Sequence, residues 1–105
     1  MLSKLTEEQK QQFSRFQIGQ IVQHFKRELV RDQYNSNEYL YKIVGLAEHT
    51  ETHEICVVYQ ALYNNGSKVK FGLYVRPLDM FCSEVNHNKY HYIKQKYRFE
   101  PVEIV

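Results

Sequence analysis

The stretch of sequence that decides the fold runs from residue 55 to residue 81 and reads ICVVYQALYNNGSKVKFGLYVRPLDMF. It holds the densest run of β-branched and aromatic residues in the chain, and such residues favour strands. We therefore predict a long strand over 55–63, a loop over 64–71, a second strand over 72–77 and a short turn after Pro77. The strand should end there because proline cannot donate to a sheet ladder.

The long strand carries apolar side chains on both of its faces. One face holds Ile55, Val57, Tyr59, Ala61 and Tyr63, and the other holds Cys56, Val58, Gln60 and Leu62. This pattern predicts burial on both sides, as occurs where a small sheet coils back on itself.

Upstream of this strand, residues 39–50 again favour a strand, and Gly45 in its middle indicates a bulge or a sharp bend. The short connection at 51–54 then predicts an antiparallel hairpin with the long strand. An earlier strand is expected over 18–26. The polar residues 27–38 predict an exposed loop, with Leu29 and Val30 tucked against the sheet.

Two further elements lie at the ends of the chain. A last pair of strands is expected over 83–85 and 97–102, with the basic segment between them as a protruding hairpin. Residues 5–16 predict a helix with Thr6 as N-cap and Gln9 three positions on. Its apolar content is thin, so we expect it to cap the domain or to pack on a second subunit in a homodimer.

These elements predict a mostly β fold of about five short strands with one N-terminal α-helix. A small antiparallel barrel of the SH3-like type fits best, and an open α+β sheet with the helix packed across it is the alternative. We expect a helical extension over 1–16 and a small β-barrel domain over 17–105.

Composition sets limits on function. The chain of 105 residues has room for one domain, and its net charge of +2 does not by itself indicate a polyanion partner. No apolar run is long enough for a bilayer and the N-terminus lacks an apolar signal core, so we expect a cytoplasmic protein. Cys56 and Cys82 are expected to be reduced, buried thiols. The nine tyrosines suit either a half-buried sheet or a binding face.

Five blocks of the sequence carry a resemblance to a known family. They are GxxxxHFK at 19–26, HTETxE at 49–54, VVYQALY at 57–63, LYVRPLxMF at 73–81 and RF at 98–99. In this order they resemble the small bacterial family called domain of unknown function 1653, over about residues 17–102. The resemblance implies no particular activity. The chain departs from the family pattern at Arg27 and the loop up to Glu38, at Tyr74 in place of a tryptophan, and in a longer segment over 87–97.

The first candidate site is a polar set at strand ends and in turns, within the blocks that carry the resemblance. Arginine at a strand end can hold a carboxylate or phosphate in a bidentate manner, and a nearby histidine can donate a hydrogen bond or act as a general base. The alternative is that Arg76 pairs with Glu51, Glu54 or Asp79 and pins a hairpin to its neighbour. No Ser-His-Asp or HExxH pattern accompanies the set. The candidate residues are His24, His49, Glu51, Tyr59, Tyr74, Arg76 and Arg98.

The second candidate site lies in the segment HNKYHYIKQKYRF at 87–99, which has no acidic residue. Its basic side chains would neutralise phosphates and its rings would stack on bases, whereas the alternative is a solvated hairpin with one face on the core. The candidate nucleic-acid-binding residues are Lys89, Tyr90, Tyr92, Lys94 and Lys96.

No cofactor and no metal ion is predicted. His49 with His53, and His87 with His91, have the i, i+4 spacing of a metal pair. That spacing brings two ligands together only on a helix, and these pairs fall in a turn and in the basic segment.

The sequence therefore predicts a non-enzymatic binding module. Its Tyr- and Arg-lined face would hold a peptide, a nucleic acid or another anionic ligand. The alternative is a small-molecule-binding protein or an enzyme that uses a pocket of His24, Tyr59 and Arg76. A shallow groove or flat basic face would favour the first, and a deep pocket where these side chains converge would favour the second.

Overall fold

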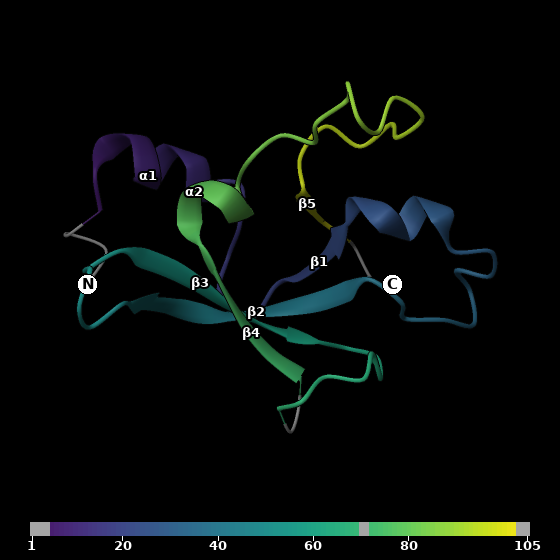
Figure 1. Ribbon diagram of the computed structural model, residues 1–105, viewed down its shortest axis with the longest axis horizontal. Helices are drawn as coiled ribbons and strands as arrows, with labels where there is room; N and C mark the ends of the chain where they lie inside the picture. The colour runs from purple at the N-terminus through teal and green to yellow at the C-terminus, as the bar shows by residue number, and fades with distance from the viewer. Residues whose placement is uncertain (1–4, 70–71, 103–105) are drawn as a thin grey trace.

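The computed structural model of the chain describes residues 5–69 and 72–102 (Figure 1). Residues 70 and 71, at the end of the loop predicted after the long strand, lie outside this part. The described strands form one antiparallel sheet in the order β4-β3-β2-β1-β5. They are β1 (Ile21–His24), β2 (Leu40–Glu48), β3 (Ile55–Ala61), β4 (Leu73–Pro77) and β5 (Phe99–Pro101).

The sheet is open. Strands β4 and β5 are its two edges, and among the described residues no ladder joins them. The predicted barrel is therefore not confirmed, and the open sheet given as the alternative is the better description. In the last segment, β5 pairs with β1 and not with residues 83–85. The expected final pair of strands is reduced to a single bridge between Glu84 and Tyr97.

The hairpin of β2 and β3 is the centre of the sheet, as predicted. Its pairing runs from Tyr41 opposite Ala61 to Glu48 opposite Ile55, and the register shifts between Ile43 and Gly45. This shift is the bulge that Gly45 indicated. Strand β4 pairs with the other side of β3 and ends at Pro77, also as predicted.

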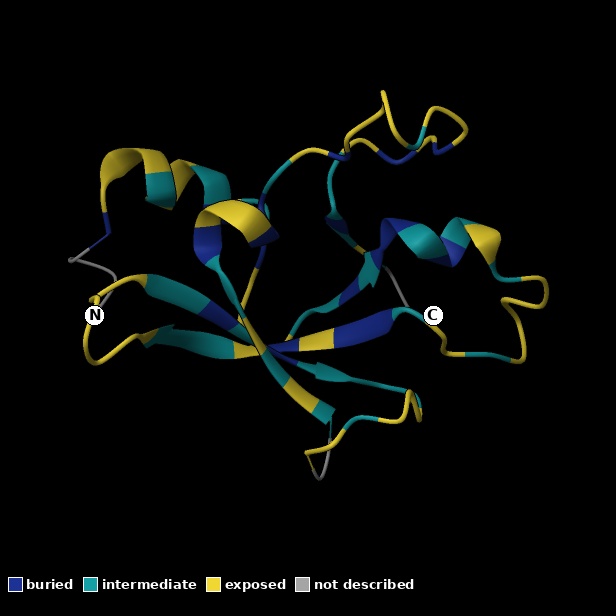
Figure 2. Ribbon diagram, in the orientation of Figure 1, coloured by how far each residue is buried: buried dark blue, intermediate teal, exposed yellow. Residues whose placement is uncertain are grey.

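One face of the sheet is buried. Val57 and Tyr59 of β3 are buried, whereas Cys56, Val58 and Gln60 on the opposite face are only partly covered. Burial on both faces was thus wrong, because the open sheet does not coil back over its outer side. Buried parts of β2 and β3 lie in the middle of the molecule and the loops are mostly exposed (Figure 2).

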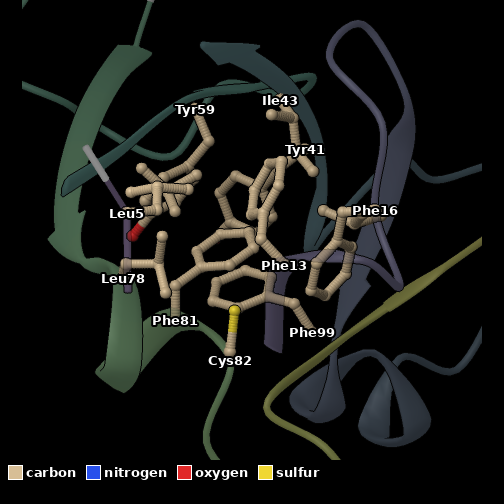
Figure 3. Close-up of a cluster of buried hydrophobic side chains, with 12 residues drawn as sticks. Leu5, Phe13, Phe16, Tyr41, Ile43, Tyr59, Leu78, Phe81, Cys82 and Phe99 are labelled. Atoms are coloured by element: carbon tan, nitrogen blue, oxygen red, sulfur yellow. The ribbon is translucent and has the colours of Figure 1, made fainter. Parts of the chain in front are cut away.

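Two helices cover the buried face: α1 (Glu7–Phe13) and the short α2 (Leu78–Phe81) (Figure 1). Figure 3 shows aromatic rings from the helices and the strands gathered between them. The rings of Phe81 and Phe99 stack at 4.2 Å between centroids with an interplanar angle of 7°. This contact fixes β5 against α2. The main core comprises Leu5, Phe13, Phe16, Val22, Tyr41, Ile43, Val57, Tyr59, Leu78, Phe81, Cys82 and Phe99.

Helix α1 is shorter than predicted but begins with the expected capping box. The Gln9 amide N–H donates to Thr6 Oγ1 at 3.1 Å, and the Thr6 N–H donates to Gln9 Oε1 at 3.0 Å. Beyond the helix, the Arg15 guanidinium carbon lies 3.6 Å from the centroid of the Tyr97 ring, and Arg15 Nη2 donates to the Cys82 carbonyl at 2.7 Å. These contacts hold the residues after α1 against Tyr97 and against Cys82, the residue that follows α2.

The loop predicted over 27–38 is more ordered than its polarity indicates. It starts inside a 3-10 helix, η2 (Phe25–Leu29), in which Arg27 is buried. The Arg27 guanidinium donates to the carbonyls of Gln33, Ser36 and Glu38 at 2.9, 3.1 and 2.7 Å. Leu29, expected against the sheet, is instead 56% exposed. Burial of Arg27 was not predicted because its partners are backbone carbonyl oxygens, which every residue has and which the sequence therefore cannot indicate.

Candidate functional site

Five of the predicted site residues converge on the inner face of the sheet. Tyr74 lies opposite Tyr59 and Arg76 lies opposite Val57 in the pairing of β3 with β4. Arg76 Nε donates to the Tyr59 hydroxyl at 3.2 Å. At the other edge, His24 ends β1 opposite Phe99, with the two ring centroids 5.2 Å apart.

Arg98, the residue before β5, completes this set. Its Nε donates to Ser83 Oγ at 3.3 Å, and its backbone N–H donates to the Ser83 carbonyl at 2.8 Å. The Arg76 guanidinium carbon lies 5.7 Å from the centroid of the neighbouring Phe99 ring. We call His24, Arg76 and Arg98 the donor cluster.

The donor cluster is positive and has no acidic partner. In residues 5–69 and 72–102 neither arginine forms an ion pair, so the predicted alternative of pairing with Glu51, Glu54 or Asp79 is not found. Burial and the nearby Arg76 charge lower the pKa of Arg98. Like charges brought together away from water raise each other's free energy, so this arrangement is unfavourable without an anion.

His24 is neutral and carries its proton on the nitrogen that has no hydrogen-bond partner among the described residues. Burial, and then the charges of Arg76, Arg98 and Lys26, lower the pKa of His24 to about 3. Its Nδ1 accepts a hydrogen bond from the Lys26 amide at 3.1 Å, so the proton of the neutral ring is on Nε2. The side chain is 8% exposed, and Nε2 has no hydrogen-bond partner among the described residues. The ring therefore carries an unused N–H group, and the charges of both arginines act on it.

Further tyrosines surround the donor cluster. Tyr39 lies 5.8 Å from His24 and 6.0 Å from Tyr63, measured between ring centroids. The hydroxyls of Tyr41 and Tyr63 are 3.0 Å apart, and burial with this hydrogen bond raises the pKa of Tyr41. Sequence reasoning did not place Tyr39, Tyr41 and Tyr63 in the site. The alternation that puts Tyr59 and Tyr63 on one face of the long strand was the available signal.

Two predicted residues, His49 and Glu51, lie elsewhere. Both belong to the turn between β2 and β3, where His49 Nδ1 accepts the amide N–H groups of Glu51 and Thr52 at 3.2 Å. The turn faces the start of α1, where His53 and Glu54 line a pocket with Thr6. These two residues were included because they lie in a turn within a block that carries the family resemblance, but the hairpin carries this turn away from Tyr59.

The basic segment is a loop packed beside η2, so the protruding hairpin was wrong. Val85 and Ile93 form a small core with Phe25, and the Tyr90 ring packs against Phe25 at 4.9 Å. The Glu28 carboxylate accepts the amide N–H groups of Lys94 and Gln95 at 3.0 and 2.7 Å. Tyr90 thus has a packing role, whereas four predicted residues remain exposed: Lys89, Tyr92, Lys94 and Lys96.

The described residues contain no group of three or more His, Cys, Asp or Glu side chains that could hold a metal ion. Cys56 and Cys82 are both free. Cys82 is buried as expected and burial raises its pKa to about 11, whereas Cys56 is only partly covered. No helix in the described part of the chain is long and apolar enough to cross a membrane.

Comparison with known proteins gives one finding. The model of a family described as a protein of unknown function, DUF1653, matches residues 20–101. No curated protein and no solved structure matches the chain. The matched range contains β1 to β5 and the donor cluster, while α1 lies before it.

Proposed function

The chain belongs to the DUF1653 family of proteins of unknown function, and we propose that it is a binding module for an anionic ligand. The anionic group sits between His24, Arg76 and Arg98 on the inner face of the sheet. The observation that carries this proposal is the pair of half-buried guanidiniums with no carboxylate partner in the described part of the chain.

Arginines in partly buried positions are normally paired, because an unpaired buried charge is unfavourable. In the donor cluster Tyr59 accepts from Arg76 Nε, and Ser83 accepts from Arg98 Nε. The terminal nitrogens of both guanidiniums have no hydrogen-bond partners among the described residues. Guanidinium groups bind carboxylate and phosphate oxygens through such terminal N–H groups. An anion between them would remove the repulsion of the two cations and also satisfy His24 Nε2.

Binding is better supported than catalysis. A general base needs a lone pair that faces the substrate, but the lone pair of His24 accepts the Lys26 amide. Its unused nitrogen carries a proton, and Tyr41 is made a weaker acid by burial, which raises its pKa. These groups can recognise an anion but have no free base to activate a nucleophile. A small-molecule ligand held by His24, Tyr59 and Arg76 is compatible with this proposal.

The test is isothermal titration calorimetry with inorganic phosphate as the probe. Each of the variants Arg76→Gln and Arg98→Gln should weaken binding by about tenfold or more, because each removes charge-assisted hydrogen bonds. The matched control is Lys42→Gln, which removes an exposed cation on β2 outside the cluster and should leave binding unchanged. Phosphate that binds both arginine variants as tightly as the wild type, with all variants folded by circular dichroism, would refute the site.

A further inference from the structure

Half-buried tyrosines continue outward from the donor cluster. Tyr39, Tyr63 and Tyr74 are partly exposed, while Tyr41 and Tyr59 behind them are buried. Neighbouring ring centroids in this group lie 5.4–6.0 Å apart. The distances are 6.0 Å for Tyr39 and Tyr63, 5.9 Å for Tyr41 and Tyr63, and 5.7 Å for Tyr59 and Tyr74. The aromatic surface therefore begins beside His24 and ends beside Arg76. We call Tyr39, Tyr63 and Tyr74 the tyrosine rim.

The rings of the rim are held in place. The Tyr63 hydroxyl is bonded to that of Tyr41, and the Tyr74 hydroxyl accepts from Asn65 Nδ2 at 2.6 Å. Tyr39 has a φ of 65°, in the left-handed region that bulky residues rarely adopt. Its carbonyl accepts the His24 amide at 3.0 Å. Strained backbone at such a residue persists only where the surroundings demand it, and it often marks a ligand contact.

We propose that the anion is the phosphate of a nucleoside phosphate, whose base stacks on the tyrosine rim. This inference rests on the proposed function and narrows its ligand. Two guanidiniums and one imidazole N–H offer donors to three oxygens, as a terminal phosphate has, whereas a carboxylate presents only two. A phosphate monoester also carries close to two negative charges, which balances the two arginines. Fixed rings beside the phosphate provide a stacking surface for a planar base.

The test compares three probes by calorimetry: inorganic phosphate, ribose 5-phosphate and adenosine 5′-monophosphate. Stacking on aromatic side chains should make the nucleotide bind at least about fivefold more tightly than ribose 5-phosphate. The variants Tyr63→Leu and Tyr74→Leu should each lower the ratio of nucleotide affinity to ribose 5-phosphate affinity, with folding of each variant checked by circular dichroism. Tyr34→Leu is the control, because Tyr34 is fully exposed in the loop after η2.

The outcomes separate the two proposals. Equal affinity for ribose 5-phosphate and the nucleotide, with phosphate binding still sensitive to Arg76→Gln, would overturn the nucleotide inference and leave the anion site standing. Absence of binding by all three probes would overturn both. A 5′-phosphorylated oligonucleotide and its unphosphorylated form then identify the source of the phosphate. Tighter binding of the phosphorylated form than of the mononucleotide indicates a nucleic-acid end, and weaker binding indicates a free nucleotide.

Discussion

Acid should destabilise this protein through His24, and the size of the effect follows from its surroundings. The ring is held neutral in the fold by burial and by Arg76, Arg98 and Lys26, so its pKa is about 3, against an ordinary value of 6.5. Below the ordinary value the unfolded chain binds a proton that the folded chain does not. The stability linked to the neutral His24 ring is therefore fully present above about pH 6.5, and the free energy of unfolding falls as the pH drops toward 3.

The loss due to His24 between about pH 7 and about pH 5 should be about 2 kcal/mol. This figure depends mainly on the ordinary pKa, because the folded ring is still almost wholly neutral at the lower pH. The perturbation is His24→Asn, which removes the titrating ring. The asparagine side-chain oxygen can accept the Lys26 amide as Nδ1 does, and asparagine is a favourable N-cap residue.

Urea unfolding measured at both pH values tests this. The wild type should lose about 2 kcal/mol more than His24→Asn over the interval. The exposed His91 provides the control, and His91→Asn should lose as much as the wild type. Equal losses in the wild type and His24→Asn would refute the description of His24 as a ring kept neutral by burial and by the two arginines.

Three further predictions concern the core, the backbone and the basic segment. Phe81→Ala removes the ring stacked on Phe99 and should lower the free energy of unfolding by about 3–5 kcal/mol. Met80→Ala, at an exposed position, should lower it by less than about 1 kcal/mol, and similar losses in the two variants would argue against the stack. Gly19→Ala should lower the melting temperature and the free energy of unfolding, the latter by roughly 1–2 kcal/mol, because φ at Gly19 is 86°. Gly45→Ala should leave both unchanged, because the added Cβ would meet nothing within 4 Å. If the basic segment binds nucleic acid as predicted, a triple alanine variant should bind labelled single-stranded DNA more weakly than the wild type and with a smaller salt dependence. Unchanged binding would refute the predicted nucleic-acid surface. The three positions are Lys89, Lys94 and Lys96.

The centre of the sheet could be predicted because its signals are local. Gly45 and the short turn after it fixed the hairpin, Pro77 fixed the end of β4, and Thr6 with Gln9 fixed the start of α1. Closure of the sheet could not be predicted. Apolar residues on both faces of β3 indicate a barrel, but Val58 and its neighbours on the outer face are only partly covered, and nothing local specifies where β5 pairs.

The candidate site was predictable to a similar extent. His24, Tyr59 and Arg76 could be grouped because they lie at strand ends or in turns within the blocks that carry the family resemblance. The basic segment could not, since alternating lysines and aromatic rings suit both a hairpin and a loop. What decides between these is the distant Glu28 carboxylate, which binds the backbone of Lys94 and Gln95. Long-range contacts of this kind leave no periodicity in the sequence.

The most direct test of the anion site is nuclear magnetic resonance of the side-chain N–H groups during titration with inorganic phosphate at constant ionic strength. The signals of Arg76 Nε, Arg98 Nε and His24 Nε2 should move together along one saturating curve, because one anion contacts all three side chains. The signal of Arg31 Nε, on an exposed side chain, should stay in place. Shifts of Arg76 and Arg98 that are no larger than that of Arg31, or that fail to saturate together, would contradict the proposal that these residues form one binding site.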